Sequence, residues 1–410
     1  MLIKELLSKG SQIFFNNGIR QLSALIVSIY IAQLYGSQGR GEYALFLAIT
    51  TVSSLILSFG IVNSLMYQIK HKIILIRQGV FLLILHTFTG LIIALFLMWV
   101  LLNYSNILNG ILQYDIGSVL ILFSLYYMVT PFSLFIIAYL LAIDNLKIHK
   151  KYILLISLAT VISFIVADIM GWHHRVHPVT IVVGSESIIV FFTLFYLISS
   201  EEPSPIELQQ IRKVYSYAAK VYFSLISSMV TTRADNFIIP LYSSISSLGV
   251  YAIAKTFYNL MLSIPTAYSG YIFGVFCHNN IYKNVKICIK VMWIIGLISF
   301  FILILLFYYM DELIFLGFGY EFIDASESAK LLSVAAALTG ISSPINSLMH
   351  ATNRPHIASV IAAFGAVVLI SLLFFLVPKY SYLGAAYSTI LGAFAVFILR
   401  VMFLLKLKTL

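Results

Sequence analysis

Long runs of apolar residues alternate with short polar connections along almost the whole chain. A helix needs about 20 apolar residues to cross the hydrocarbon core of a bilayer. About twelve stretches reach that length: 12–34, 43–69, 78–102, 116–142, 152–170, 178–198, 216–241, 249–276, 287–309, 329–350, 357–378 and 382–405. The longest connections, near 199–214 and 310–328, are each under about 20 residues and leave no room for a soluble domain. The pattern predicts an all-α polytopic membrane protein with about 12 transmembrane helices.

The composition agrees with this prediction. The chain has 410 residues, of which 61% are hydrophobic and 10% charged, with a mean hydropathy of +1.00. A soluble surface needs far more charge. No small-residue cleavage site follows the short amphipathic start, so we expect the first apolar stretch to remain as a helix. The only two cysteines, Cys277 and Cys288, form no metal-ligand spacing, and we expect neither a disulfide nor a metal site.

The basic residues indicate how the helices are oriented. When alternate connections are assigned to opposite sides, 18 of the 25 Lys and Arg fall on one side, and only Arg40, Arg175, Lys330 and Lys379 fall on the other. By the positive-inside rule, both termini are cytoplasmic. The basic residues are spread over about seven short segments, which favours contact with lipid headgroups and not with nucleic acid.

A short motif recurs half a chain apart and suggests two related halves. Leu34-Tyr-Gly-Ser leads to Gly41-Glu-Tyr-Ala after the first helix, and Leu241-Tyr-Ser-Ser leads to Gly249-Val-Tyr-Ala after the seventh, an offset of about 207 residues. Six helices in each half would be related by an axis along the membrane normal. We therefore expect two six-helix bundles, residues 1–200 and 215–410, joined by a cytoplasmic linker at 201–214, around a central cavity.

Three basic residues, Arg20, Arg233 and Lys255, lie inside apolar stretches, with only Asp235 close by as a partner. A charge at membrane depth is costly and is usually functional. Arg233, Asp235 and Lys255 lie at matching depths, about two turns from the outer ends of their helices. Two interpretations stay open: a cation pairs with Asp235 and holds two helices together, or the cations contact an anionic ligand, for which guanidinium suits phosphate.

Two other acids lie at depth and are candidates for ion pairing or for carrying a coupling proton. They are Glu186 and, near the outer end of its helix, Asp168, which could instead reach outward to water. His173, His174 and His177 gather in an outer connection, where a wetted loop is favoured over a loosely bound metal. Pro265 and Pro344 would kink their helices.

Several motifs together resemble the Wzx-type polysaccharide flippases of the multidrug/oligosaccharidyl-lipid/polysaccharide exporter superfamily. They are Gly39-Arg-Gly-Glu-Tyr43, Gly60-Ile61 ending the second helix, Thr232-Arg-Ala-Asp-Asn236, Leu248-Gly-Val-Tyr-Ala-Ile-Ala254, Ile314-Phe-Leu-Gly-Phe-Gly-Tyr320, Asn353-Arg-Pro355, and Pro378 followed by Leu383-Gly-Ala-Ala386. The resemblance covers essentially the whole chain, and it depends on the order and spacing of the motifs more than on any one of them.

The resemblance implies a flippase of the bacterial inner membrane, with a cationic lumen, that moves an undecaprenyl-pyrophosphate-linked O-antigen repeat unit from the cytoplasmic to the periplasmic leaflet by alternating access. In this interpretation Arg20, Arg233 and Lys255 bind the substrate. The expected partners are the lipid-linked glycan and the bilayer, with an O-antigen polymerase and a chain-length regulator as further candidates. No cofactor is expected, and a coupling ion, H⁺ or Na⁺, stays open.

Rival functions are weighed against the same residues. An exporter of cationic drugs would need buried acids, whereas buried bases predominate here. A lipid II flippase usually carries two more helices. A membrane enzyme of the O-antigen polymerase or ligase type would carry a large periplasmic loop and a catalytic constellation, and neither is evident. Export of another lipid-linked glycan or a small molecule is the remaining alternative.

Overall fold

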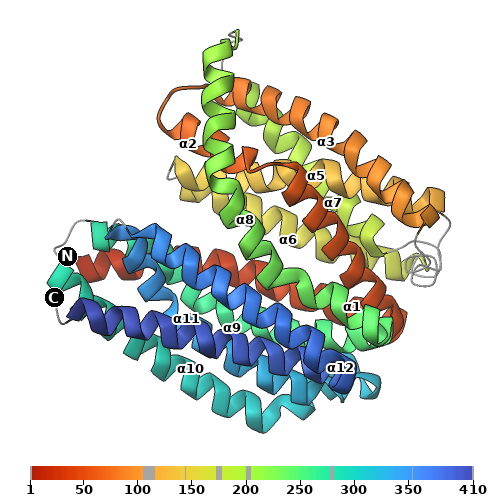
Figure 1. The fold of residues 1–410 in the computed structure, drawn as a ribbon. Coiled ribbons are helices and arrows are strands. Elements are labelled where there is room, and N and C mark those ends of the chain that lie inside the picture. The colour runs from red at the N-terminus through yellow and green to blue at the C-terminus, as the bar shows by residue number, and fades with distance from the viewer. Residues whose placement is uncertain are drawn as a thin grey trace. The chain divides into compact units, whose positions relative to one another are not determined.

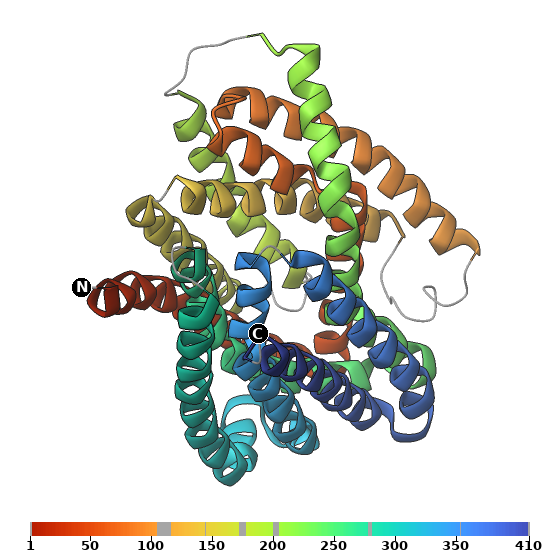
Figure 2. The ribbon, with the colours of Figure 1, turned by 60° about the vertical axis from the view of Figure 1, so that its left-hand side comes forward.

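The computed structural model describes residues 2–104, 116–143, 145–171, 178–199, 205–277, 281–352 and 354–408. Every regular element in these ranges is a helix (Figures 1 and 2). The chain divides into two compact units. The first unit joins Met1–Gly41 to Val230–Leu410, and the second unit is Glu42–Met229.

Two long helices, α1 (Leu2–Leu57) and α8 (Leu208–Tyr242), begin in one unit and end in the other. The other helices of the second unit are α2 (Ile61–Lys70), α3 (Ile76–Tyr104), α5 (Ile116–Ala142), α6 (Leu146–Ile169) and α7 (Pro178–Ser199). The first unit contains α9 (Ile245–Cys277), α10 (Ile281–Phe318), the short 3₁₀ helix η2 (Tyr320–Phe322), α11 (Ala325–Ala351) and α12 (Pro355–Lys408). Within it, α11 contacts α9, α10 and α12, and the beginning of α1 and the end of α12 lie at the same end in Figure 1.

The predicted membrane-spanning stretches are helical, except that a turn at residues 58–60 interrupts the stretch 43–69. Eight helical segments in the described part of the chain are long and apolar enough to cross a membrane. Two of these, in α1 and α12, contain one residue with non-helical backbone angles, Gly36 (φ 64°, ψ −170°) and Ser381 (φ 52°, ψ −133°). α12 therefore holds two of the predicted stretches, and α1 holds one of them together with the first part of the stretch 43–69, which continues in α2. The two remaining stretches, 216–241 and 249–276, are α8 and α9, in which polar residues interrupt the apolar sequence. The chain is therefore a multi-pass membrane protein, and the prediction of twelve helical segments is confirmed.

The division into two bundles at 201–214 stays a prediction. The compact units place residues 1–41 with the later helices and keep the first part of α8 with the earlier ones. The described part of the predicted linker begins at residue 205, and α8 already starts at Leu208. Side chains hold this segment to the second unit, because Gln78 donates to the Pro205 carbonyl at 2.8 Å and Ser64 donates to the Val214 carbonyl at 2.5 Å.

The position of Arg40 corrects the sequence analysis, which places it in an outer connection. The positive φ of Gly36 changes the chain direction at a single residue, so a helix resumes at once and no loop forms. Arg40 is buried, and its Nε donates to the Ser28 hydroxyl at 3.2 Å. Ser28 precedes the bend, so this hydrogen bond joins the two arms of α1.

The repeated motif forms a reciprocal contact inside the first unit. A Cβ added to Gly41 of α1 would lie 2.0 Å from the Ile245 carbonyl oxygen of α9, and one added to Gly249 would lie 1.9 Å from the Ser37 carbonyl oxygen. Ser37 lies four residues before Gly41, and Ile245 lies four residues before Gly249. Each glycine therefore faces the carbonyl that stands four residues before the other glycine. This exchange is the contact that a local two-fold relation between the copies produces.

Candidate functional site

A polar cavity of about 330 Å³ lies in the first unit, among α8, α9, α11 and α12. It is lined by Thr231, Thr232, Arg233, Asp235, Tyr251, Lys255, Tyr258, Asn259, Leu332 and Thr389. The helices approach closely because the side of α11 that packs on its neighbours is made of small residues, among them the fully buried Ala335 and Ala336. Two of the three predicted cations therefore share one cavity.

Lys255 of α9 forms an ion pair with Asp235 of α8 at the wall of this cavity. Its Nζ lies 2.7 Å and 2.5 Å from the two carboxylate oxygens, and it also donates to the Thr232 carbonyl at 2.8 Å. The side chain of Asp235 is 7% exposed and that of Lys255 is 18% exposed. All three donor positions of the ammonium are thus occupied, and the interpretation of Lys255 as a helix-pairing residue is favoured for this conformation.

Two further groups hold the carboxylate of Asp235. The Tyr251 hydroxyl donates to Oδ2 at 2.9 Å, and the backbone N–H of Asn236 donates to Oδ1 at 2.9 Å. The Tyr251 oxygen also lies 3.3 Å from the Thr389 hydroxyl of α12. This network links α8, α9 and α12, and it fully hydrogen-bonds a charge that burial alone would make costly.

Arg233 lines the same cavity but does not take part in this network of hydrogen bonds. It is half-buried, and it has no ion pair and no hydrogen bond among the described residues. It lies two positions before Asp235, which on a helix points the two side chains in different directions. Because Asp235 is already paired with Lys255, the guanidinium of Arg233 gives the cavity one positive charge in excess.

The other predicted site residues lie elsewhere. Arg20 is exposed on α1 and does not line the cavity. Asp168 and Glu186 are half-buried in the second unit, on α6 and α7. The three histidines at 173, 174 and 177 lie outside the described residues, and the described part of the chain contains no group of three or more His, Cys, Asp or Glu side chains that could hold a metal ion.

The network also contains residues that the sequence analysis did not single out as site residues. Tyr251 and Lys255 are four positions apart, so they lie on one face of α9, and Tyr258 extends this face by one turn. This helical spacing from Lys255 is the feature of the sequence that could have identified Tyr251 and Tyr258 as site residues. Thr389 carries no such signal, because only the packing of α12 brings it to the cavity.

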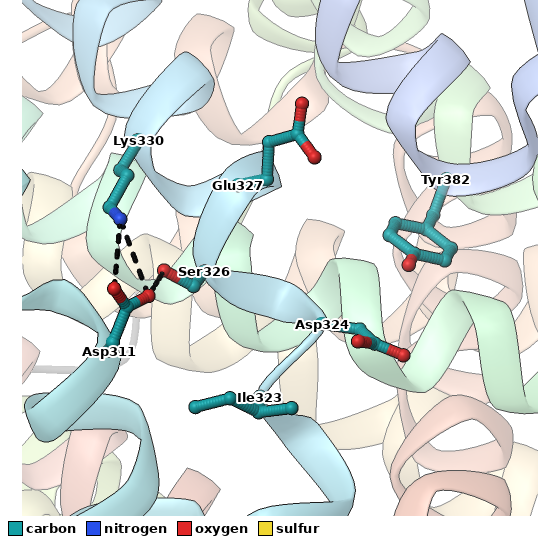
Figure 3. Close-up of a pocket in the computed structure, with 7 residues that line it drawn as sticks. All are labelled: Asp311, Ile323, Asp324, Ser326, Glu327, Lys330 and Tyr382. Atoms are coloured by element: carbon teal, nitrogen blue, oxygen red, sulfur yellow. Dashed lines mark hydrogen bonds and ion pairs between the residues drawn. The ribbon is translucent and has the colours of Figure 1, made fainter.

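A second cavity in the first unit, of about 310 Å³, has the opposite polarity (Figure 3). It is lined by Asp311, Ile323, Asp324, Ser326, Glu327, Lys330 and Tyr382. Lys330 lies 3.2 Å from the Asp311 carboxylate, and the Ser326 hydroxyl donates to the same carboxylate. The described residues that line this cavity carry three carboxylates, those of Asp311, Asp324 and Glu327, and one ammonium, so this cavity would repel an anion, whereas the Arg233 cavity would attract one.

Comparisons with known proteins identify the fold. No protein-family model matches the chain, and no curated protein matches it in sequence. Among solved structures, it is similar to the lipid II flippase MurJ in an inward closed conformation, with a TM-score of 0.73 and 14% identity over 97% of this chain and 90% of that chain. It is also similar to an inward-facing multidrug resistance MATE family transporter of the MOP superfamily, with a TM-score of 0.70 and 13% identity over 95% and 96%.

A third similar structure is a MOP superfamily transporter from Pyrococcus furiosus, described as having a binding pocket of reverse polarity that suggests a different function. Its TM-score is 0.67 and its identity 13%, over 98% of this chain and 96% of that chain. These neighbours are transporters and a flippase, not enzymes. The chain therefore has the fold of the MOP superfamily transporters and of the lipid II flippase MurJ.

Proposed function

We propose that this protein is a flippase for a lipid-linked oligosaccharide with an anionic, phosphate-containing head. The observation that carries the proposal is the guanidinium of Arg233, which faces a membrane-protein cavity and has no anionic partner among the described residues. A charge kept at such a position is costly unless a ligand offsets it. The planar guanidinium can donate two parallel hydrogen bonds to a phosphate.

Two of the similar structures support this choice of substrate class. One is a flippase for lipid II, and another is described as having a pocket of reverse polarity within the same superfamily. An exporter of cationic drugs would need free acids in its cavity. Among the described residues that line this cavity, Asp235 is the one acid, and Lys255 already neutralises it.

The geometry suggests how the cavity would treat the substrate. Lys255 and Tyr251 hold the Asp235 carboxylate against the wall, so its charge does not oppose an incoming phosphate. Arg233 would replace part of the water around the phosphate, while the polyprenyl tail remains in the lipid. Thr231 and Asn259 line the same cavity and offer hydrogen bonds to sugar hydroxyls, whereas Asn236 is buried beside Asp235.

The finer assignment is part of the same proposal. The substrate is an undecaprenyl-pyrophosphate-linked O-antigen repeat unit, moved by alternating access from the cytoplasmic to the periplasmic leaflet of a bacterial inner membrane. In that setting Arg20 would be an early contact on the cytoplasmic side. An O-antigen polymerase and a chain-length regulator would act on the product. Another lipid-linked glycan with a phosphate head would suit the cavity equally well.

Replacement of Arg233 tests the proposal. In a flippase-deleted strain, we expect Arg233→Ala to reduce O-antigen display at least about tenfold relative to the wild-type protein at matched membrane levels, because a charge-assisted hydrogen bond to phosphate contributes roughly 1.5–3 kcal/mol. Arg233→Lys should restore part of the display, since the charge returns without the paired donors. Display is measured by immunoblotting of surface polysaccharide.

Lys330→Gln is the matched control. It removes a cation from the acidic cavity, where Lys330 is already paired with Asp311. We expect display to stay within about twofold, because exposed ion pairs contribute little. Normal display with Arg233→Ala would remove the cationic cavity from the mechanism.

A further inference from the structure

Arg400 is a further cation within a membrane-spanning segment of the first unit. It lies in α12, inside the apolar stretch Pro355–Leu407, and is half-buried. The positive-inside argument counts it among the cytoplasmic anchors. Its Nη1, however, donates to the Ser342 hydroxyl of α11 at 3.0 Å. Among the described residues, Ser342 is its one polar contact, and no carboxylate pairs with it.

The side chain of Arg400 does not point in the direction expected for an arginine that contacts lipid headgroups. Ser342 is fully buried and lies nine residues before the end of α11 at Ala351, which is about 13 Å along the helix. The guanidinium is thus directed across to the interior of α11, not towards the last turn of α12. An arginine that served only to reach the lipid headgroups would extend the other way.

The surroundings make an unpaired guanidinium costly. Val396, one turn before Arg400, and the adjacent Leu399 are partly buried, and Phe403 and Leu404, one turn after it, are buried. All four pack into an apolar cluster with residues of α9, α10 and α11. The Ser342 hydroxyl accepts a hydrogen bond from one of the five N–H donors of the guanidinium, and it does not neutralise the positive charge.

Arg400 also lies in line with the Arg233 cavity. Thr389 lines that cavity, and eleven residues, close to three helical turns, separate it from Arg400, so both lie on one face of α12 about 16 Å apart. On α11, ten residues separate Leu332, which lines the cavity, from Ser342. The distance along α11 from the cavity to Ser342 is therefore similar to the distance along α12 from the cavity to Arg400. Between these two depths, the Ser342 hydroxyl donates to the Thr339 carbonyl of α11 at 3.1 Å.

We propose that Arg400 is a second anion-binding residue, which contacts the phosphate groups of the substrate on the cytoplasmic side of the Arg233 cavity. This inference rests on the proposed function, because it assigns the same substrate a second contact. A pyrophosphate spans far less than 16 Å, so Arg233 and Arg400 would hold it in turn. A substrate that moves outward would meet Arg400 before Arg233.

The test counts binding sites for a soluble probe. The purified full-length protein in detergent is titrated with radiolabelled farnesyl pyrophosphate by equilibrium dialysis. We expect two probe molecules per wild-type chain, one for Arg400→Gln, one for Arg233→Gln and none for the double variant. Arg400→Lys should keep the second site with about tenfold weaker affinity, because it retains the charge and loses the paired donors. Farnesol, which lacks the phosphates, should displace nothing.

Ser342→Ala is the matched control for a purely structural role. It removes the same hydrogen bond between α11 and α12 and leaves the charge, so we expect two sites. If Ser342→Ala and Arg400→Gln lose the same site, Arg400 only bridges the helices and the proposal fails. If phosphatidylglycerol displaces the probe from the Arg400 site at equal concentration, that site holds a lipid headgroup and not the substrate.

The remaining outcomes separate this inference from the proposed function. A single wild-type site that only Arg233→Gln removes would overturn the role of Arg400 and leave the proposed function in place. No binding to the wild-type protein would overturn both.

Discussion

Lys255→Met is expected to lower the free energy of unfolding by about 3–5 kcal/mol, because it leaves the buried Asp235 carboxylate without its counter-charge. The methionine fills a similar volume, so the lost charge and not a cavity causes the effect. The Tyr251 hydroxyl and the Asn236 N–H still donate to the carboxylate, but neither carries a positive charge. Thermal unfolding of the purified protein in detergent measures the change, and the amount of protein in the membrane should fall with it.

The double variant Asp235→Leu with Lys255→Met is the decisive comparison. Removal of both charges replaces the pair with apolar side chains, so most of the lost stability should return. Arg233→Gln serves as a control for loss of a cation from the same cavity. It should change the stability by less than about 1 kcal/mol, since Arg233 pairs with no acid among the described residues. Equal melting of Lys255→Met and the wild type would show that the ion pair does not hold α8 to α9.

This prediction changes how transport defects should be interpreted. A loss of display in a Lys255 variant can follow from a less stable protein, whereas Arg233 variants report on the cavity itself. The two cations are similar in the sequence, because both lie about two turns from an outer helix end. Their difference in role depends on which of them reaches Asp235.

The sequence alone could not decide that pairing. The helical repeat separates Arg233 from Asp235 on α8, but the contact between Asp235 and Lys255 depends on how α8 and α9 are rotated about their own axes. That rotation is set by packing against α11 and α12, including small residues such as Ala336 that carry no chemical signal. The depth of these charged residues in the membrane could therefore be predicted from the sequence, but the ion pair that they form could not.

The helices themselves were far more predictable. A membrane span has to satisfy its own backbone hydrogen bonds and needs a long apolar sequence, so length and hydropathy indicate it directly. The connections were harder to predict, and the placement of Arg40 in a loop was wrong. A single residue with positive φ, Gly36, replaces the expected connection, and nothing in the composition distinguishes such a bend from a loop.

The glycine contact between α1 and α9 leads to the second large effect. Gly41→Ala is expected to lower the free energy of unfolding by an amount at the upper end of about 1–3 kcal/mol, because the new Cβ would lie 2.0 Å from the Ile245 carbonyl oxygen and the backbones would have to separate. Gly249→Ala should have a similar effect through the Ser37 carbonyl. Thermal unfolding in detergent measures both variants.

Two comparisons make this expectation specific to the reciprocal contact. Gly184→Ala is the matched control, because Gly184 is a helical glycine in α7 with nothing within 4 Å of an added Cβ, and alanine there should stabilise the helix by about 0.5–1 kcal/mol. The double variant Gly41→Ala with Gly249→Ala should lose less than the two single variants together, since one separation of the helices relieves both clashes. If Gly41→Ala unfolds at the same temperature as Gly184→Ala, the two copies of the motif do not pack at this distance, and the two-fold relation between them loses its structural basis.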